Sequence, residues 1–266
     1  MSGHEPVRRL FAHLQHRREQ RALRRRAIPD ELWRLTLARM PFLAHLPAAD
    51  SAELRRLSSL FLDRKEFSGA HGLQVSDDMA VAIAAQACLP VLRFGLAPYD
   101  GFVGIVVQPD EVRVRREVTD DDGIVHEYDD VLSGEAMDGG PVMLSWHDVG
   151  AAGESAAWGY NVVIHEFAHV LDMGDGIADG VPPLPSAGAR RAWQATLQRE
   201  YDAFCARVDA GADTLLDPYA AEAPEEYFAV ASEAFFVAPL DLRHEQPDTY
   251  ALLAGYYRQD PAVRQR

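Results

Sequence analysis

Residues 161–173 read Asn-Val-Val-Ile-His-Glu-Phe-Ala-His-Val-Leu-Asp-Met, and this stretch decides how the rest of the chain is interpreted. It contains the pattern H-E-x-x-H, with His165, Glu166 and His169 at the fixed positions. Because a helix has 3.6 residues per turn, the two histidines lie one turn apart on one face. Two imidazoles so placed can bind one Zn²⁺, and Glu166 is then a candidate general base beside the metal.

The sequence around the two histidines predicts a buried helix, because apolar residues occupy nearly every side of it. Buried polar groups without partners cost roughly 2–7 kcal/mol each, and a bound metal satisfies the histidines and the glutamate together. Gly174 and Gly176 follow Met173 and predict where the helix ends. The apolar positions are Val162, Val163, Ile164, Phe167, Ala168, Val170 and Leu171.

A tetrahedral catalytic zinc needs a third protein ligand and one open position for water. The only histidine after His169 is the distant His244, so we expect a carboxylate from a later helix. The best segment is 217–236, which has Pro224 near a helix start and then an apolar run. Glu226 and Glu233 lie two turns apart on this predicted helix and share a face, so the pattern leaves both open as the ligand.

The chain resembles the Mlc titration factor A family, also called the DgsA anti-repressor family. The segments that carry the resemblance are 160–173, 217–219 and 226–236, and residues 89–107 and 142–146 are also similar. The likeness covers most of the chain from about residue 30 onward. The catalytic core of the family is similar to that of the anthrax lethal factor protease.

This resemblance implies a zinc peptidase of the gluzincin type with aminopeptidase-like activity. It implies one Zn²⁺ held by His165, His169 and Glu226, with Glu166 activating the water. It also implies that Tyr219, seven residues before Glu226, hydrogen-bonds the oxyanion that forms during hydrolysis. Enterobacterial members bind and sequester the glucose-responsive repressor Mlc, so a transcriptional repressor is an expected protein partner beside a peptide substrate.

A second hypothesis belongs to another class of function. In it, the protein is a regulatory binding protein that sequesters a sugar-responsive repressor, and zinc mainly serves structure. The presence of Glu166 favours the peptidase, since a structural site needs no general base. The ligand set of two histidines and a glutamate favours zinc, although Mn²⁺, Co²⁺ or Ni²⁺ also bind such sets.

Other residues are candidates for supporting roles around the metal. Metal-binding imidazoles usually donate their second N–H to a carboxylate or carbonyl, and Asp172 or Glu233 could accept it. Asn161 stands one turn before His165, where a helix cap is a better interpretation than a substrate contact.

The run 141–146, which includes Ser145 and Trp146, precedes the active helix and has Pro141 at its start. It is interpreted as an edge strand along which a peptide substrate docks, or else as an ordinary core strand.

Composition limits the class of protein. The chain has 266 residues, 48% of them hydrophobic, and a net charge of −15, which argues against direct nucleic-acid binding. It has no run of 18 apolar residues and no apolar signal-peptide core, so we expect a cytoplasmic protein without a membrane span. Cys88 and Cys205 lie in apolar surroundings and are expected to be free thiols.

We expect one zincin-like metallopeptidase domain at 28–266, preceded by a basic arm or amphipathic helix at 1–27. The fold class is α+β, mostly helical with a small mixed or antiparallel sheet. Helices are expected as a pair within 28–62 broken at Pro41, and at 77–88, 189–208, 224–237 and 247–258. Strands are expected at 102–108 and 112–118, joined as a hairpin at Pro109-Asp110, and at 124–128 after a turn at 120–123.

Overall fold

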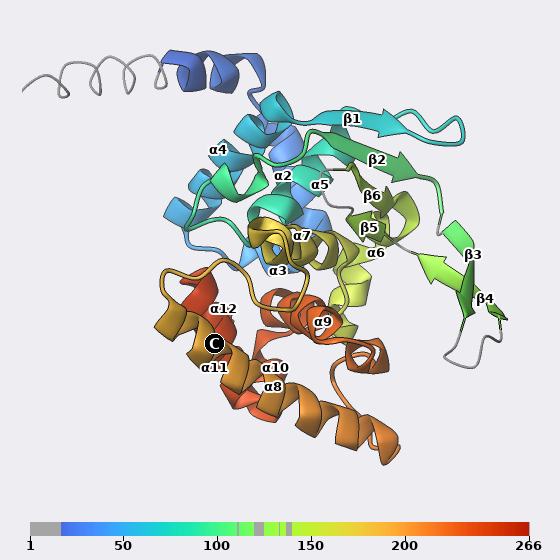
Figure 1. Cartoon of the computed structure of the whole chain (residues 1–266). Coiled ribbons are helices and arrows are strands. Elements are labelled where there is room, and N and C mark those ends of the chain that lie inside the picture. Colours follow the sequence, from blue (N-terminus) through green and yellow to red (C-terminus); the bar gives the residue numbers. More distant parts are fainter. Residues whose placement is uncertain (1–16, 111, 120–124, 133, 137–139, 266) are drawn as a thin grey trace, which may run out of the picture.

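The computed structural model describes residues 17–110, 112–119, 125–132, 134–136 and 140–265 (Figure 1). The expected turn at 120–123 and the first 16 residues of the expected arm lie outside this range. No helix of the described part is long and apolar enough to cross a membrane.

Helices make up most of the described chain, as expected for the α+β class. The expected helices around 161–173, 77–88, 189–208, 224–237 and 247–258 are all present. Proline begins five of the helices, where its missing N–H costs no hydrogen bond. The helices are α2 (Asp30–Arg39), α3 (Pro41–Ala44), α4 (Ala48–Arg64), α5 (Asp77–Cys88), α6 (Trp146–Ser155), α7 (Val162–Asp172), α8 (Ala187–Asp209), α9 (Pro224–Val237), α10 (Pro239–Glu245), α11 (Pro247–Tyr257) and α12 (Pro261–Arg264).

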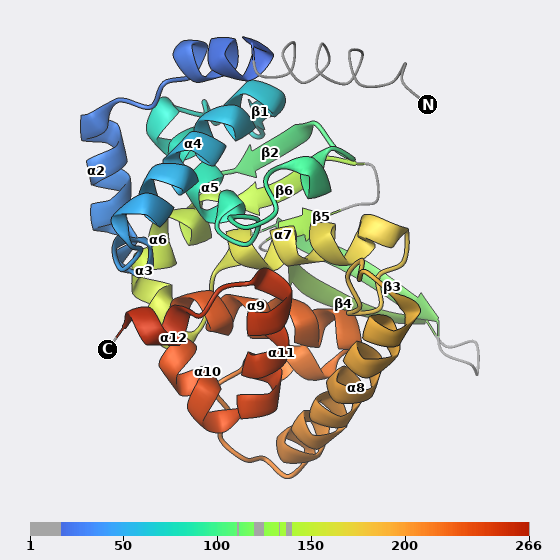
Figure 2. The same cartoon turned by 90° about the vertical axis from the view of Figure 1, so that its left-hand side faces the viewer.

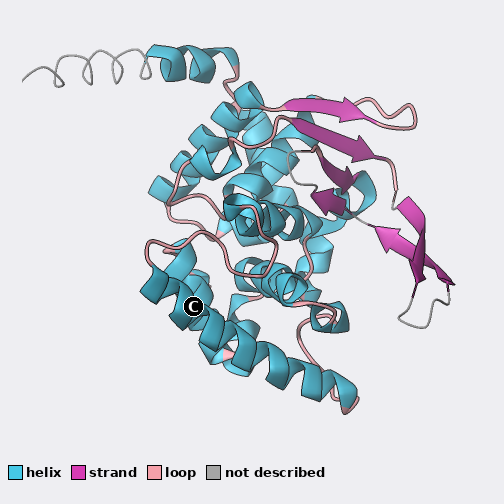
Figure 3. Cartoon of the chain, in the orientation of Figure 1, coloured by secondary structure: helices cyan, strands magenta, loops and turns pink. Residues whose placement is uncertain are grey.

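The main sheet has four strands in the order β1-β2-β6-β5 (Figure 3). Strands β1 (Glu66–Gly69), β2 (Gly104–Gln108) and β6 (Val142–Ser145) are parallel to one another. Strand β5 (Gly134–Ala136) pairs antiparallel with β6. A separate antiparallel ribbon is formed by β3 (Val112–Thr119) and β4 (Val125–Leu132).

The main sheet is mixed, because β1, β2 and β6 are parallel and β5 is antiparallel to β6. Of the two expected alternatives, the mixed sheet is therefore present and the purely antiparallel sheet is wrong. Strands β2 and β3 do not form the expected hairpin, because β2 pairs with β1 and β6 while β3 pairs with β4. Strand β6, which ends at Ser145, lies between β2 and β5, so the core-strand alternative for 141–146 holds and the edge-strand alternative is wrong. Pro141 precedes β6 and therefore removes no hydrogen bond from it.

Helix α7 lies between the sheet and the C-terminal helices (Figure 2). It contacts β5 and β6 on one side and α9 on the other. Phe167 anchors it in an aromatic cluster, with ring centroids 4.9 Å from Tyr99 and 5.6 Å from Phe61. Phe167 is half a turn away from His165 and from His169, so the buried aromatic face directs both histidines toward α9.

The N-terminal helical residues 17–25 contact α4. Arg25 forms an ion pair with Asp63 at 2.6 Å, and Glu19 pairs with Arg56. Ala22 is buried at this contact. The described part of the basic segment therefore packs against the body of the protein.

Gly180 ties the loop after α7 to the end of α7 and to α8, and it lies against Pro224 at the start of α9. Its N–H donates to Asp172 at 2.8 Å, and its carbonyl accepts from Trp193 at 2.8 Å. Its φ of +73° lies in the left-handed region that favours glycine. A Cβ here would lie 2.5 Å from the carbonyl oxygen of Pro224 and 2.9 Å from Leu197.

Gly180→Ala is expected to lower the free energy of unfolding by about 2–4 kcal/mol, because backbone strain adds to the clash with Pro224. Chemical denaturation measures the loss. Gly176→Ala is the matched control, since Gly176 has a φ of +89° but nothing within 4 Å of its Cβ position. Equal losses in the two variants would contradict the role given to the clash.

Candidate metal centre

Asn161 begins the helix that carries the H-E-x-x-H pattern. Its side-chain oxygen accepts a hydrogen bond from the Ile164 N–H at 2.9 Å, as a helix cap does. The cap fixes the first turn of α7, and the following turn presents His165, Glu166 and His169. The three side chains of the motif are thus positioned by one short, buried helix.

The structure brings His165, His169 and Glu226 together. The two Nε2 atoms are 3.1 Å apart, and the Glu226 Oε2 atom is 3.3 Å from each of them. Glu226 reaches them from the first turn of α9, which begins at Pro224. Glu233, the other candidate for the third ligand, does not join this cluster of metal-facing atoms.

These three side chains fit a zinc ion. Zinc binds nitrogen and carboxylate oxygen at about 2.0–2.1 Å, so two ligand atoms of a tetrahedral site lie roughly 3.3 Å apart. The observed separations of 3.1, 3.3 and 3.3 Å therefore match three corners of such a tetrahedron. Two imidazoles and a carboxylate leave the fourth corner for water or substrate.

Glu233 contacts the ring nitrogen of His165 that faces away from Glu226 and His169. Its Oε1 atom lies 2.8 Å from His165 Nδ1, and its Oε2 atom accepts a hydrogen bond from the Asn161 N–H. Asn161 in turn donates from its side chain to Gln86 at 2.7 Å. A proton on Nδ1 of His165 leaves the lone pair of Nε2 facing Glu226, which is the tautomer that a metal requires.

The carboxylates around His165 and His169 favour a positive charge at these two histidines. Burial lowers the pKa of His165, but the carboxylates of Glu226 and Glu233 outweigh it and leave that pKa well above its ordinary value. Burial raises the pKa of Glu226, yet hydrogen bonds from the two histidines hold it far below the usual range. Burial raises the pKa of Glu233. A divalent cation supplies the positive charge that this arrangement favours.

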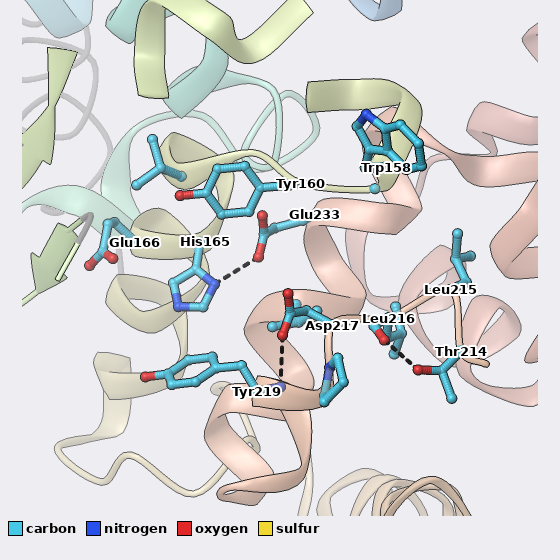
Figure 4. A pocket seen from close by; sticks show the side chains of 14 residues that line it. Trp158, Tyr160, His165, Glu166, Thr214, Leu215, Leu216, Asp217, Tyr219 and Glu233 are labelled. Atoms are coloured by element: carbon cyan, nitrogen blue, oxygen red, sulfur yellow. Dashed lines mark hydrogen bonds and ion pairs between the residues drawn. The ribbon is translucent and has the colours of Figure 1, made fainter. Parts of the chain in front are cut away.

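Glu166 and Tyr219 line one cavity beside His165 (Figure 4). Glu166 is 4% exposed, next in sequence to His165. Tyr219 belongs to the short 3₁₀ turn Pro218–Ala221, and its ring centroid is 6.2 Å from that of His165. Its N–H donates to Asp217 Oδ1 at 2.9 Å, which fixes the turn.

Three residues that the sequence suggested as supports of the metal or of a substrate lie away from the two histidines' ligand atoms. Asp172 is fully buried and accepts from the Gly180 N–H, and burial raises its pKa to about 6. Ser145 caps α6 by accepting from the Asp148 N–H at 3.4 Å. Trp146 is the first residue of α6. Neither Ser145 nor Trp146 lines the cavity beside the histidines.

Sequence reasoning found Tyr219 and Glu233 but missed the rest of the other side of this cavity. The wall opposite α7 comes from residues 214–219 and from α9, and the exposed Trp158 stands at one end. The segment 214–216 carries no motif, and its neighbours become apparent only in three dimensions. The turn signal at Gly159 could have drawn attention to Trp158.

Glu233→Gln is expected to weaken zinc binding by about 10- to 100-fold, a range typical of groups that orient a ligand. The amide can accept at only one oxygen, so it loses either His165 or the Asn161 N–H. Competition with a chelator measures the dissociation constant. The matched control is Glu225→Gln in the same helix turn as Glu226, outside the metal cluster. Unchanged zinc affinity in the Glu233 variant would contradict the orienting role.

The helix pair and donor set described above are typical of a metallopeptidase-type centre. The chain belongs to the glucose-regulated metallo-peptidase M90 family, whose sequence profile matches residues 14–258.

Relatives named Mlc titration factor A confirm the resemblance stated from the sequence. The protein of that name from Pectobacterium atrosepticum is 38% identical over 237 residues, covering 88% of each chain. The one from Edwardsiella ictaluri is 38% identical over 230 residues, covering 85% of this chain and 86% of the relative. An uncharacterized protein of Synechocystis sp. is 36% identical over 246 residues, covering 92% and 89%.

Proposed function

We propose that this protein is a zinc-dependent peptidase of the gluzincin type. The observation that carries the proposal is the triangle of His165 Nε2, His169 Nε2 and Glu226 Oε2, with sides of 3.1–3.3 Å. Glu166 adjoins this triangle in the wall of a substrate-sized cavity. Membership of a metallopeptidase family supports the same function.

The proposed roles follow from chemistry and position. When bound, Zn²⁺ lowers the pKa of a water molecule toward about 7 and polarises a carbonyl group. Glu166 takes the proton of that water and passes it to the leaving amine. The hydroxyl of Tyr219 donates a hydrogen bond to the oxyanion that develops on the substrate. Glu233 keeps His165 in the tautomer that leaves Nε2 free to bind.

Further parts of the proposal rest on the family and on composition. We propose aminopeptidase-like cleavage by a single domain at 28–266, with residues 1–27 as an arm. Asp172 and Asn161 are proposed to support α7, through Gly180 and through the helix cap. Cys88 and Cys205 are free thiols, which supports a reducing, cytoplasmic location.

A regulatory role is the second candidate function. The relatives of about 35–38% identity carry the name Mlc titration factor A. This name supports the proposal that the present chain also binds a transcriptional repressor, with the metal serving structure if hydrolysis is absent. Calorimetric titration with the Mlc-type repressor of the same organism tests this role. If repressor binding is independent of catalysis, Glu166→Gln binds the repressor with the same affinity as the unaltered chain. A weaker affinity of this variant would contradict that independence.

Removal and return of zinc test the peptidase. The purified chain is expected to bind one zinc per molecule and to hydrolyse unblocked peptides and aminoacyl anilides. Chelation is expected to remove at least about 99% of the activity, and an equivalent of zinc to restore it, because the metal activates the water. Metal content by mass spectrometry and hydrolysis by chromatography are measured on the same samples. Hydrolysis by the metal-free chain at the original rate would refute the proposal.

A further inference from the structure

The cavity beside the candidate metal centre has a volume of about 460 Å³. His165 and Glu166 line it at one side, so anything bound in it lies directly beside the groups proposed to cleave a peptide. Its size falls in the range of about 300–1,000 Å³ that is typical of ligand pockets. His169 does not line the cavity, which therefore extends to one side of the histidine pair.

The side chains that line the cavity away from the catalytic groups are mostly apolar. Glu233 does not offer a free carboxylate there, because His165 Nδ1 and the Asn161 N–H already engage its two oxygens. Asp217 holds the N–H of Tyr219 with its Oδ1 atom. The apolar and aromatic lining residues used in this argument are Trp158, Tyr160, Val162, Leu215, Leu216 and Val230.

Local hydrogen bonds hold the wall of the cavity in place. The Thr214 hydroxyl donates to the Leu216 carbonyl at 2.8 Å, and Asp217 accepts from Tyr219 two residues later (Figure 4). Gly159, with a φ of +77°, makes the turn that places Trp158 at the end of the cavity. A pocket that is formed before binding spends little conformational entropy on its ligand.

Trp158 is 81% exposed, although it carries the largest apolar surface of any residue type. Exposed tryptophans beside a pocket are typical of binding sites, because they gain most when a ligand covers them. The indole can contact a side chain that enters the cavity from the centre.

Charge decides which side chains the cavity rejects. Glu166, Asp217 and Glu233 surround it, and the whole chain has a net charge of −15. An acidic side chain in the apolar part of the cavity would lose its hydration and lie near the carboxylates of Glu166, Asp217 and Glu233. A basic side chain meets carboxylates that already have other roles. Glu233 holds His165 Nδ1 and the Asn161 N–H, Asp217 holds the Tyr219 N–H and is exposed to solvent, and Glu166 is the proposed general base.

We infer that this cavity is a specificity pocket that accepts a large apolar side chain adjacent to the scissile bond and rejects acidic ones. This inference rests on the proposed peptidase function and names the substrate class of the same site. Leu215 and Trp158 are the residues that determine the preference.

The test uses the full-length, zinc-loaded chain and peptides that differ only at one residue beside the scissile bond, on either side. That residue is leucine, phenylalanine, alanine, lysine or aspartate. The kcat/KM for leucine or phenylalanine is expected to exceed that for alanine by at least about 10-fold, since even one methylene in an apolar pocket is worth about that much. Aspartate is expected to be the poorest. Equal values for all five residues, or a preference for lysine, would overturn the inference.

Two variants assign the preference to the pocket. Leu215→Lys is expected to lower the leucine-to-alanine ratio of kcat/KM at least about 10-fold and to raise the aspartate-to-alanine ratio. Trp158→Ala removes a side chain that lies mostly in solvent, so it folds even if the first variant does not, and it is expected to lower the leucine-to-alanine ratio at least threefold. Leu240→Lys makes the same substitution at an exposed leucine outside the cavity and should keep the ratio of the unaltered chain. Unchanged ratios in Leu215→Lys and Trp158→Ala would refute the assignment.

Binding separates this inference from the proposed function. Fluorescence anisotropy with labelled versions of the same peptides measures affinity for Glu166→Gln, whether or not the chain hydrolyses anything. If the leucine peptide binds more tightly than the alanine peptide but the unaltered chain hydrolyses neither, the peptidase function is refuted and the specificity pocket is supported. Hydrolysis of all five peptides at similar rates, with similar affinities, supports the peptidase and refutes the pocket.

Discussion

Glu166→Gln is expected to lower the turnover of the zinc-loaded protein by about 10²- to 10⁴-fold while one zinc remains bound. The amide has nearly the shape of the carboxylate but cannot accept the proton of the attacking water. Glu166 is not one of the three side chains whose atoms converge, so its substitution leaves the ligand set intact. Turnover of a peptide substrate and metal content by mass spectrometry are measured on one preparation.

Glu225→Gln is the control for a change of charge near the centre. Glu225 precedes Glu226 in α9 but does not line the cavity with Glu166 and His165. It is expected to change turnover less than about threefold, since half-buried charges at this distance are screened. Hydrolysis by Glu166→Gln at the rate of this control would show that another group acts as the base.

Glu226→Ala is expected to abolish stoichiometric zinc binding. The variant keeps only His165 and His169 as ligands, whereas a catalytic zinc site needs three protein ligands. The loss of affinity should exceed the 100-fold or so expected at most from removing an orienting group such as Glu233. Competition with a chelator measures the zinc dissociation constants of Glu226→Ala and Glu233→Gln, so the two losses can be compared directly.

Glu225→Ala controls for the removal of a carboxylate from the first turn of α9. Both residues stand near the positive end of the helix dipole, so the two variants lose the same dipole interaction. Only Glu226 has its oxygen 3.3 Å from both histidines. If Glu226→Ala bound zinc with the affinity of Glu225→Ala, the assignment of the third ligand would be wrong.

The elements that could be predicted from sequence are those whose signals are local. Helices α5, α7 and α9 follow from apolar runs, capping residues and Pro224, and all lie within a few residues of the structure. The parallel sheet has no such signal, because its strands are far apart in sequence: α5 lies between β1 and β2, and the β3–β4 ribbon lies between β2 and β6. The proline and aspartate at 109–110 indicate a turn, but not which strand pairs with which.

In the candidate site, too, the residues set by local sequence could be predicted, and those set by packing between helices could not. His165, Glu166 and His169 are recognisable because one helix turn sets their geometry. The choice between Glu226 and Glu233 depends on how α9 packs against α7, which spacing along α9 does not specify. The structure separates them, since Glu226 faces Nε2 of His165 while Glu233 faces Nδ1.

The converging side chains come from two helices that belong to different parts of the fold. Helix α7 is held to the sheet side by Phe167 and its aromatic neighbours, whereas Glu226 arrives with the C-terminal helices. A cation bound by residues of both α7 and α9 would therefore cross-link these two parts of the fold. Free energy released by ion binding adds to the cohesion of these two parts. Any motion that separated α7 from α9 would also move Glu226 away from His165 and His169 and would weaken the binding of such an ion.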